Sequence, residues 1–305
     1  GGIYSGDPER LSARETMPVL KNLESQYGSV IRGLMAKKNR SEDAFKKASG
    51  PRLSLFVSFE EGMETLIQAM TSSLEPGTLK LGEEAARLVY DRAEQKWAIF
   101  TRNGESCDAD SVCSSTSAGS LRPLLEETAP SVARKLTEVS YQSVATVNFA
   151  YRQEDIGDPL TGSGFIVPAS EGKSMTACTF SSRKFGNRAP GGCEVLRAFV
   201  GGAFGKKYFE MEDKELIQKV QSDLASLLKI KKEPLFWSLA RFPRRMAQYH
   251  VEHRELVTEI ERELGGYKGL FLTGCAYRGS GIPNAIKDGV AQAERIYGEL
   301  YTSPN

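Results

Sequence analysis

The feature that constrains this fold most is a short apolar run followed by a glycine-rich turn and a helix, within residues 269–297. Residues 270–273 read LFLT, which predicts a short buried strand, and Pro283 suits the first turn of a helix. The turn between them carries Gly274, Gly279 and Gly281. A helix start exposes free backbone N–H groups that attract anionic or electron-rich atoms, and glycines let a ligand approach the backbone closely.

Pattern alone leaves two interpretations of this turn open. Ala285, Gly289 and Ala293 form a stripe of small residues that permits close packing on a sheet or on a nucleotide. The turn lacks, however, the third glycine of a dinucleotide-binding fingerprint. A tight connection between a strand and a helix therefore explains the turn as readily as a nucleotide site does.

Composition and charge exclude several classes of protein. A chain of 305 residues is long enough for one large domain or two intertwined ones. Its 40 basic and 39 acidic residues are balanced, and no long basic block marks a site for nucleic acid or an anionic membrane. No stretch approaches the roughly 18 apolar residues of a membrane span, so we expect a soluble protein, at most peripheral to a membrane.

Cysteine and histidine content argues against disulfides and metal sites. The five cysteines are odd in number and include no C-x-x-C pair, so a reducing cytoplasm is the simplest location. His250 and His253 are the only imidazoles, and we interpret both as structural residues. No metal is predicted.

Hydrophobic periodicity predicts both helices and strands. Ser12 and Glu15 fit a capping box at a helix start. Helices are expected over residues 18–34, 64–74, 121–135, 212–228 and 254–264. Strands are expected within residues 53–63, 79–91, 96–104, 110–113, 144–151, 164–167, 175–180 and 195–201. These strands imply a mixed sheet.

Eight segments occur in order along the chain: GGIYSGDPERLS, GMETLIQAM, SVATVNFAY, GSGFIVPASEG, MTACTFSSRKF, VLRAFVGG, RFPRRMAQYHVEH and GLFLTGCAYRGSGIPNAIKDG. Their order and approximate spacing resemble the C-terminal two-thirds of the FAD-dependent protoporphyrinogen and coproporphyrinogen oxidases, a family of the flavin amine oxidase superfamily. TACTFSSRKF and MAQYHVEH are typical of this family, particularly of its Gram-positive-type members.

The resemblance implies an α/β (α+β mixed) fold. Part of a FAD-binding domain of the amine-oxidase type would carry an inserted mixed-sheet substrate domain and a helical segment. The implied divisions are a helical segment over 1–50, FAD-domain portions over 51–122 and 236–305, and a substrate-binding domain over 123–235. Nothing in the sequence matches the family's N-terminal glycine-rich βαβ unit, so we expect a C-terminal fragment, a split subunit or a truncated chain.

Six residues match the family's contacts with FAD. Ala85 stands where a valine contacts the adenine side of the cofactor through backbone groups. Phe242 matches a residue near the isoalloxazine ring, although a core aromatic is the alternative. The other four are Gly274, Ser280, Gly281 and Ile282. The N–H groups of the last three would stabilise negative charge on the reduced flavin. Cys275 replaces an asparagine or alanine near the flavin, and we interpret it as a small buried hydrophobe.

The resemblance also implies contacts with the substrate. The residues that match the apolar walls around a cyclic tetrapyrrole are Ser163, Gly164, Ile166 and Phe199. A glycine inside a strand is typical of a site where something approaches closely, which favours a ligand at Gly164. Arg183 and Lys184 would pair with propionate carboxylates of the substrate. Core packing for Ile166 and Phe199, and solvated charges for the two cations, are the alternatives.

The implied activity is the six-electron oxidation of a porphyrinogen in heme biosynthesis, with O2 reduced to H2O2 and no catalytic base from the protein. The Gram-positive-type motifs favour coproporphyrinogen III over protoporphyrinogen IX. One rival is another member of the amine-oxidase and carotene-desaturase superfamily, which would bind amines or polyenes. The other is a non-catalytic remnant that binds porphyrin or a heme-pathway enzyme.

We predict that the 305-residue chain alone does not hold FAD tightly, because the matching segments supply only one wall of the cofactor site. Flavin absorbance of the purified chain, measured after gel filtration with excess FAD, should be far below one equivalent. Stoichiometric, tightly bound flavin would contradict this prediction.

Overall fold

The computed structural model describes residues 4–37 and 57–301, and the chain divides into two compact units. Unit 1 comprises Gly1–Glu9, Asn22–Leu79 and Gln142–Met246. Unit 2 comprises Arg10–Lys21, Lys80–Tyr141 and Ala247–Asn305. Each unit is therefore assembled from segments that lie far apart in the sequence.

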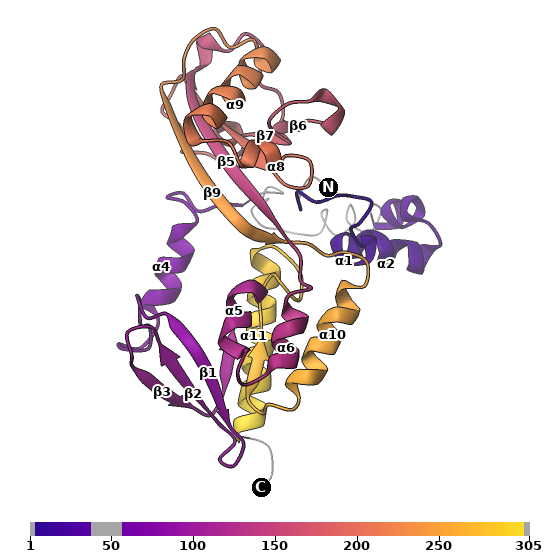
Figure 1. The fold of residues 1–305 in the computed structure, drawn as a ribbon. Helices are drawn as coiled ribbons and strands as arrows, with labels where there is room; N and C mark the ends of the chain where they lie inside the picture. Colours follow the sequence, from indigo (N-terminus) through magenta and orange to yellow (C-terminus); the bar gives the residue numbers. More distant parts are fainter. Residues whose placement is uncertain (1–3, 38–56, 302–305) are drawn as a thin grey trace, which may run out of the picture. The chain divides into compact units, whose positions relative to one another are not determined.

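Unit 1 is built around a five-stranded sheet with strand order β6-β7-β8-β5-β9 (Figure 1). The strands are β5 (Tyr141–Arg152), β6 (Gly164–Ile166), β7 (Ala177–Phe180), β8 (Cys193–Gly201) and β9 (Phe236–Ala247). Strand β8 pairs antiparallel with both β5 and β7, and β6 pairs antiparallel with β7. The helices of this unit include α4 (Glu64–Ser72), α7 (Ser181–Lys184), α8 (Lys206–Phe209) and α9 (Asp213–Leu228).

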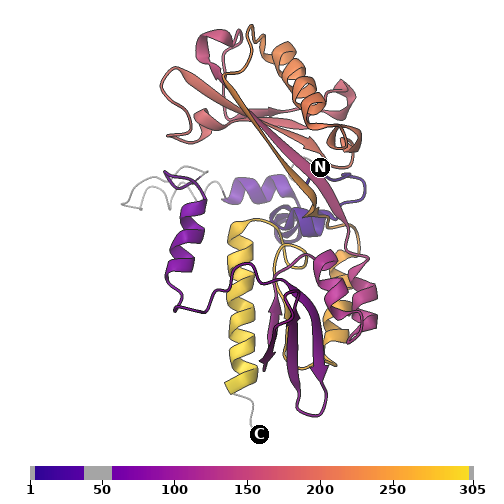
Figure 2. The ribbon, with the colours of Figure 1, turned by 60° about the vertical axis from the view of Figure 1, so that its left-hand side comes forward.

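Helix α9 covers one face of this sheet (Figures 1 and 2). Successive strand residues point to opposite faces, so every second side chain of β5 is buried, from Ala145 to Tyr151. These residues pack with alternate residues of β7 and β8 and with the apolar side of α9, including Leu216, Val220 and Leu224. Among the described residues, the opposite face carries no buried core cluster, and its side chains are half-buried or exposed. We call it the open face.

Unit 2 contains an antiparallel meander and a short parallel pair. The meander consists of β1 (Ala85–Asp91), β2 (Lys96–Thr101) and β3 (Ser106–Ala109). The parallel pair consists of β4 (Val112–Ser114) and β10 (Leu270–Leu272). The longer helices beside these strands are α5 (Ala118–Leu125), α6 (Pro130–Leu136), α10 (His253–Leu264) and α11 (Ile282–Tyr301). Figure 2 shows α11 on one side of the strands and α5, α6 and α10 on the other.

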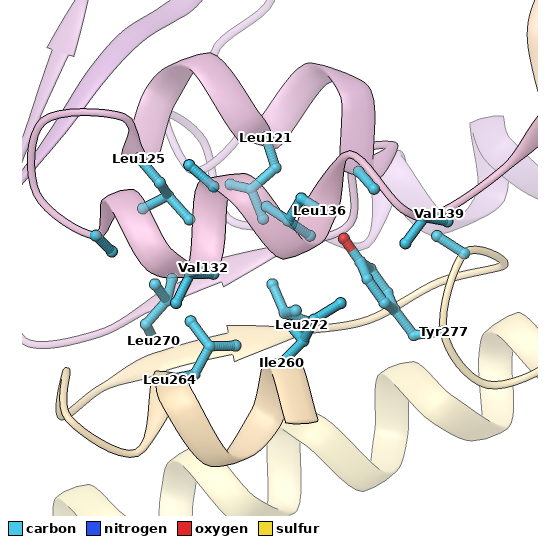
Figure 3. Packing of buried hydrophobic residues seen from close by; sticks show 14 of the residues in the cluster. Leu121, Leu125, Val132, Leu136, Val139, Ile260, Leu264, Leu270, Leu272 and Tyr277 are labelled. Atoms are coloured by element: carbon cyan, nitrogen blue, oxygen red, sulfur yellow. The ribbon is translucent and has the colours of Figure 1, made fainter. Parts of the chain in front are cut away.

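The core of unit 2 lies between these helices and β10. Figure 3 shows Leu121 and Leu125 of α5 pointing toward Leu270 and Leu272, with Ile260 of α10 below them. Burying a Leu or Ile side chain contributes about 1.5–3 kcal/mol. The apolar core thus fixes β10, the strand that leads into the glycine-rich turn.

The unit boundaries differ from the four predicted segments. The chain crosses between units at 9/10, 21/22, 79/80, 141/142 and 246/247, whereas the predicted divisions lie at 50/51, 122/123 and 235/236. The reason is that α6, which was expected in the substrate-binding segment, packs through Val132 and Leu136 in the core of unit 2. Residues 236–246, which the predicted segments place in the C-terminal FAD-domain portion, belong to unit 1, where β9 pairs with β5.

Most predicted elements are present, with two interruptions. The helix predicted over 121–135 is two helices, because Pro130 begins α6 and cannot continue α5. The helix predicted over 18–34 begins as α2 (Pro18–Tyr27), is interrupted at Gly28, which has φ 69°, and resumes at residues 30–37. Ser12 caps α1 (Ala13–Thr16) as predicted, but the carboxylate of Glu15 pairs with Arg254.

One strand was missed, and one predicted strand is not found. Strand β9 was not predicted because it has no clear alternation of apolar residues. It lies at the edge of the sheet, where exposed arginines and Pro243 are tolerated. The strand predicted over 53–63 is absent from residues 57–63, and its first four residues lie outside the described residues. Within residues 4–37 and 57–301, no helix is long and apolar enough to cross a membrane.

We predict that Leu121→Ala lowers the free energy of unfolding of unit 2 by about 2–5 kcal/mol, because Leu121 is fully buried and a cavity would remain. The matched control is Leu81→Ala, in the same unit, where the side chain is 83% exposed. Urea unfolding should show a shift for the first variant and almost none for the second. Equal midpoints would show that this core does not stabilise the unit.

Candidate functional site

A glycine-rich turn joins β10 to α11, as the sequence predicts. Gly274, Gly279 and Gly281 have φ values of 104°, 106° and 97°, a region that side chains with a Cβ rarely adopt. Helix α11 begins at Ile282, and Pro283 occupies its first turn. Cys275 differs from the expectation: it is exposed, not buried.

A buried carboxylate holds this turn in place. One oxygen of Asp288, on α11, accepts hydrogen bonds from Thr273 Oγ1 at 2.6 Å and from the Gly274 N–H at 2.8 Å. Its other oxygen accepts from Arg278 Nη1 at 3.3 Å. Arg278 also donates to the Leu272 carbonyl at 2.6 Å and to Glu261. The end of β10, the turn and the first half of α11 therefore form one polar network.

The network keeps Asp288 ionised. Burial raises the pKa of this carboxyl, but the hydrogen bonds from Thr273 and Gly274 and the charge of Arg278 outweigh burial and leave the pKa below its ordinary value. Sequence reasoning did not find Asp288. An acidic residue on a helix next to a stripe of small residues was the available signal.

The backbone at the helix start has free donors. Asn284 Nδ2 donates to the Ser280 carbonyl at 2.8 Å, and the Ala285 N–H donates to the Gly281 carbonyl at 3.0 Å. Within the described part of the chain, the N–H groups of Ser280, Gly281 and Ile282 donate no hydrogen bond. Three unpaired donors at the start of a long helix can bind an electron-rich edge of a ligand.

The other two predicted cofactor residues lie elsewhere. Ala85 begins β1, the edge strand of the meander in unit 2, next to a register irregularity between Ala85 and Arg87. An edge strand has a row of unpaired backbone groups, which is compatible with contact through the backbone. Phe242 is on β9 in unit 1 and is 43% exposed, which is not the environment of a core aromatic.

Three of the predicted substrate residues share the open face of the sheet in unit 1. Ile166 is opposite Ala177 on β7, which in turn is opposite Phe199 on β8. Gly164 lies two residues before Ile166 on β6 and therefore points to the same face. Ile166 is 74% exposed, so it is not a core residue. Ser163 precedes this strand, and its carbonyl accepts a hydrogen bond from the Phe180 N–H.

The structure gives a reason for glycine at position 164 that the sequence did not reveal. Its φ is 142°, and a Cβ at this position would lie 2.2 Å from the Cys178 carbonyl oxygen. The close neighbour that requires glycine is therefore the adjacent strand β7. The glycine is not by itself evidence of a ligand.

The two predicted cations are already engaged. Arg183 forms an ion pair with Glu194 at 2.5 Å, and Glu194 is buried on the covered side of β8, where Leu196 and Ala198 also point. The Nη2 atom of Arg183 makes this ion pair, so the buried carboxylate of Glu194 already neutralises the charge of Arg183. The ammonium of Lys184 lies 5.5 Å from the centre of the Phe185 ring.

A pocket of about 370 Å³ lies in unit 1 at the end of the sheet. Ile166 is the predicted substrate residue that lines it. Other lining residues are Lys173, Thr176, Gly201, Phe204 and Lys207. The pocket is mainly apolar, and two lysines line it.

These features agree with comparison to known proteins. Residues 1–297 match the flavin-containing amine oxidoreductases, and the chain belongs to this family. Its relatives include the coproporphyrinogen III oxidase of Bacillus subtilis (strain 168), with 28% identity over 95% of this chain and 61% of that protein. The coproporphyrinogen III oxidase of Staphylococcus aureus (strain NCTC 8325 / PS 47) is 27% identical over 98% of this chain and 64% of that protein.

A solved structure confirms the fold. A protein from Exiguobacterium sp. 255-15, provisionally named a protoporphyrinogen oxidase, matches with a TM-score of 0.81 and 27% identity. The match covers 98% of this chain and 61% of that one. The resemblance to porphyrinogen oxidases and the α/β fold are therefore confirmed, while the chain spans less than two thirds of the length of these relatives.

We predict that Asp288→Asn lowers the free energy of unfolding at pH 7 by about 1–3 kcal/mol, because an amide cannot accept from Thr273, Gly274 and Arg278 at once. The folded-state pKa of Asp288 is lowered, so its contribution is present at neutral pH and is lost as the pH falls below about 4. Urea unfolding at pH 7 and pH 3 should therefore show a smaller gap between the two proteins at pH 3. Asp108→Asn, at an exposed position on β3, is the control. A gap that is unchanged with pH would refute the role of the ionised carboxylate.

Proposed function

We propose that this chain provides one wall of the flavin site and the substrate surface of a FAD-dependent porphyrinogen oxidase. The reaction converts coproporphyrinogen III to coproporphyrin III. Six electrons and six protons leave the substrate, and three O2 molecules take them up as three H2O2. The observation that carries the proposal is the open face of unit 1, where Ile166 and Phe199 present apolar side chains in register across β7.

The residues of the turn fit a flavin. The proposed contacts are the N–H groups of Ser280, Gly281 and Ile282 on the pyrimidine edge, with Gly274 holding the turn, and Ala85 and Phe242 as further contacts. FAD, when bound, accepts hydride from the porphyrinogen and passes the electrons to O2. The protein's part is to orient the substrate and to stabilise negative charge through backbone donors that are already in place. No strong base is needed, because ring N–H protons can leave to water.

Coproporphyrinogen III is the proposed substrate, and protoporphyrinogen IX is the alternative. The two bacterial relatives named above support the first, and the motif TACTFSSRKF supports either porphyrinogen over an amine or a polyene. The proposal places the reaction in heme biosynthesis. It places the protein in a reducing cytoplasm, which the five free cysteines of the chain favour. An interaction with another enzyme of that pathway remains part of the proposal.

Visible spectroscopy and two parallel assays test this function. With saturating FAD, the chain should shift the flavin bands. The reconstituted enzyme should produce porphyrin faster from coproporphyrinogen III than from protoporphyrinogen IX, with three O2 consumed per porphyrin. Porphyrin binding without any flavin binding would instead identify a non-catalytic remnant. Oxidation of amines or polyenes, but of neither porphyrinogen, would identify another member of the superfamily.

We predict that Gly281→Val weakens FAD binding about tenfold or more, because a β-branched residue at φ 97° would displace the free N–H groups of the turn. Gly104→Val is the matched control: it also has a positive φ, of 89°, but lies in the β2–β3 hairpin. Quenching of FAD fluorescence measures the affinity. Equal affinities for the two variants would remove the turn from the proposed cofactor site.

A further inference from the structure

The open face carries a polar row beside its apolar row. In the apolar row, Ile166, Ala177, Phe199 and Thr146 are successive cross-strand partners on β6, β7, β8 and β5. Two residues along each strand, a second row consists of Gly164, Thr179, Arg197 and Asn148. Asn148 also contacts Ser238 on β9. The polar side chains of this row thus extend across β7, β8, β5 and β9.

Arg197 is the charged residue of this row, and its neighbours hold it in one orientation. Its Nε donates to Asn148 Oδ1 at 2.8 Å. The amide nitrogen of Asn148 donates to Ser238 Oγ at 3.1 Å, which fixes which end of the amide faces Arg197. The guanidinium is therefore tethered through its inner nitrogen.

The outer nitrogens of Arg197 are unused. Among residues 4–37 and 57–301, neither terminal nitrogen has a hydrogen-bond partner or forms an ion pair with a carboxylate. By contrast, the guanidinium of Arg241 donates hydrogen bonds to Asp213 and to two backbone carbonyls. Arg183 is paired with Glu194 on the opposite face. A planar fork with two free donors matches the two oxygens of a carboxylate.

The spacing suits a ligand that is apolar at its centre and carboxylated at its rim. Residues two apart on a strand are about 6.7 Å apart, and alternate strands are about 9.6 Å apart. A macrocycle in contact with Phe199 and Ile166 would therefore place a short acid side chain over Arg197. The porphyrinogen carries such propionates around an apolar macrocycle.

We propose that Arg197 binds a carboxylate of the substrate through its two terminal nitrogens, and that Asn148 is the residue that positions it. This inference rests on the proposed function, because it assumes that a tetrapyrrole lies on the open face. It replaces Arg183 with Arg197 as the cation that determines recognition of the propionates.

The test compares an acid and an ester on the 305-residue chain, and needs no flavin. Tryptophan quenching measures the affinity for coproporphyrin III and for its tetramethyl ester in the same co-solvent. Arg197→Met should weaken binding of the acid about tenfold or more and change binding of the ester less than about twofold. Arg197→Lys keeps the charge but loses the fork, and should fall between wild type and Arg197→Met. Asn148→Ala should lower the ratio of acid to ester affinity by a smaller factor.

Arg102→Met is the matched control, since Arg102 is an exposed arginine on the hairpin of unit 2. Urea midpoints verify that all variants are folded. If wild type binds the acid but Arg197→Met weakens acid and ester equally, or not at all, this inference is overturned and the proposed function stands. Loss of the acid preference in Arg183→Met alone would likewise overturn it. If wild type binds neither porphyrin, the proposed substrate surface fails and the inference fails with it.

Discussion

The carboxylate of Asp288 is the interaction on which the geometry of unit 2 depends. Three glycines give the turn after β10 its path, but glycine also gives a chain freedom to leave that path. Asp288 removes this freedom by accepting from Thr273 and Gly274, at the two residues where the strand ends. Because Asp288 sits on α11, the same bonds fix the helix start to the strand. The free N–H groups of residues 280–282 thereby acquire a defined direction, which a ligand site requires.

In unit 1, the alternation of side chains along the strands fixes the direction of the groups at the candidate substrate surface. The same strands that bury Val147 and Leu196 under α9 must present Asn148 and Arg197 on the opposite face. Once α9 covers one face of the sheet, the other face is a rigid, half-exposed surface, and no further element is needed to form it. Side chains on that surface are held by the register of five strands, so a tether such as the one from Asn148 to Arg197 has fixed ends.

Local pattern allowed much of the fold to be predicted, and the failures have specific physical causes. Helices α9 and α10 and strands β5 and β8 were predicted because their apolar residues recur with the period of the element. Strand β9 was missed because an edge strand needs no such period, and Pro130 was overlooked as a helix break. The turn after β10 was predicted correctly, since its glycines and Pro283 are local signals. Asp288 was not identified, because its partners are 10 to 15 residues away and only the folded turn brings them together.

The substrate residues show the same limit from another direction. Gly164 was chosen because it matches a substrate contact of the family, and a strand glycine, which indicates close approach, supported the choice. The approach is real, but Cys178 of the neighbouring strand makes it. Arg183 was chosen because it is cationic and near a family motif, although the burial of Glu194 requires it as a counter-ion. Charge and residue type alone do not distinguish an arginine that neutralises a buried acid from one that is free to bind. The distinction depends on the face of the sheet to which each arginine points. Along β8, Leu196 and Ala198 are buried on the covered face, whereas Arg197 lies between them on the open face, with Phe199. The alternation of buried and exposed side chains along β8 therefore says more about which cation can bind the substrate than the positions of the cations in the sequence do.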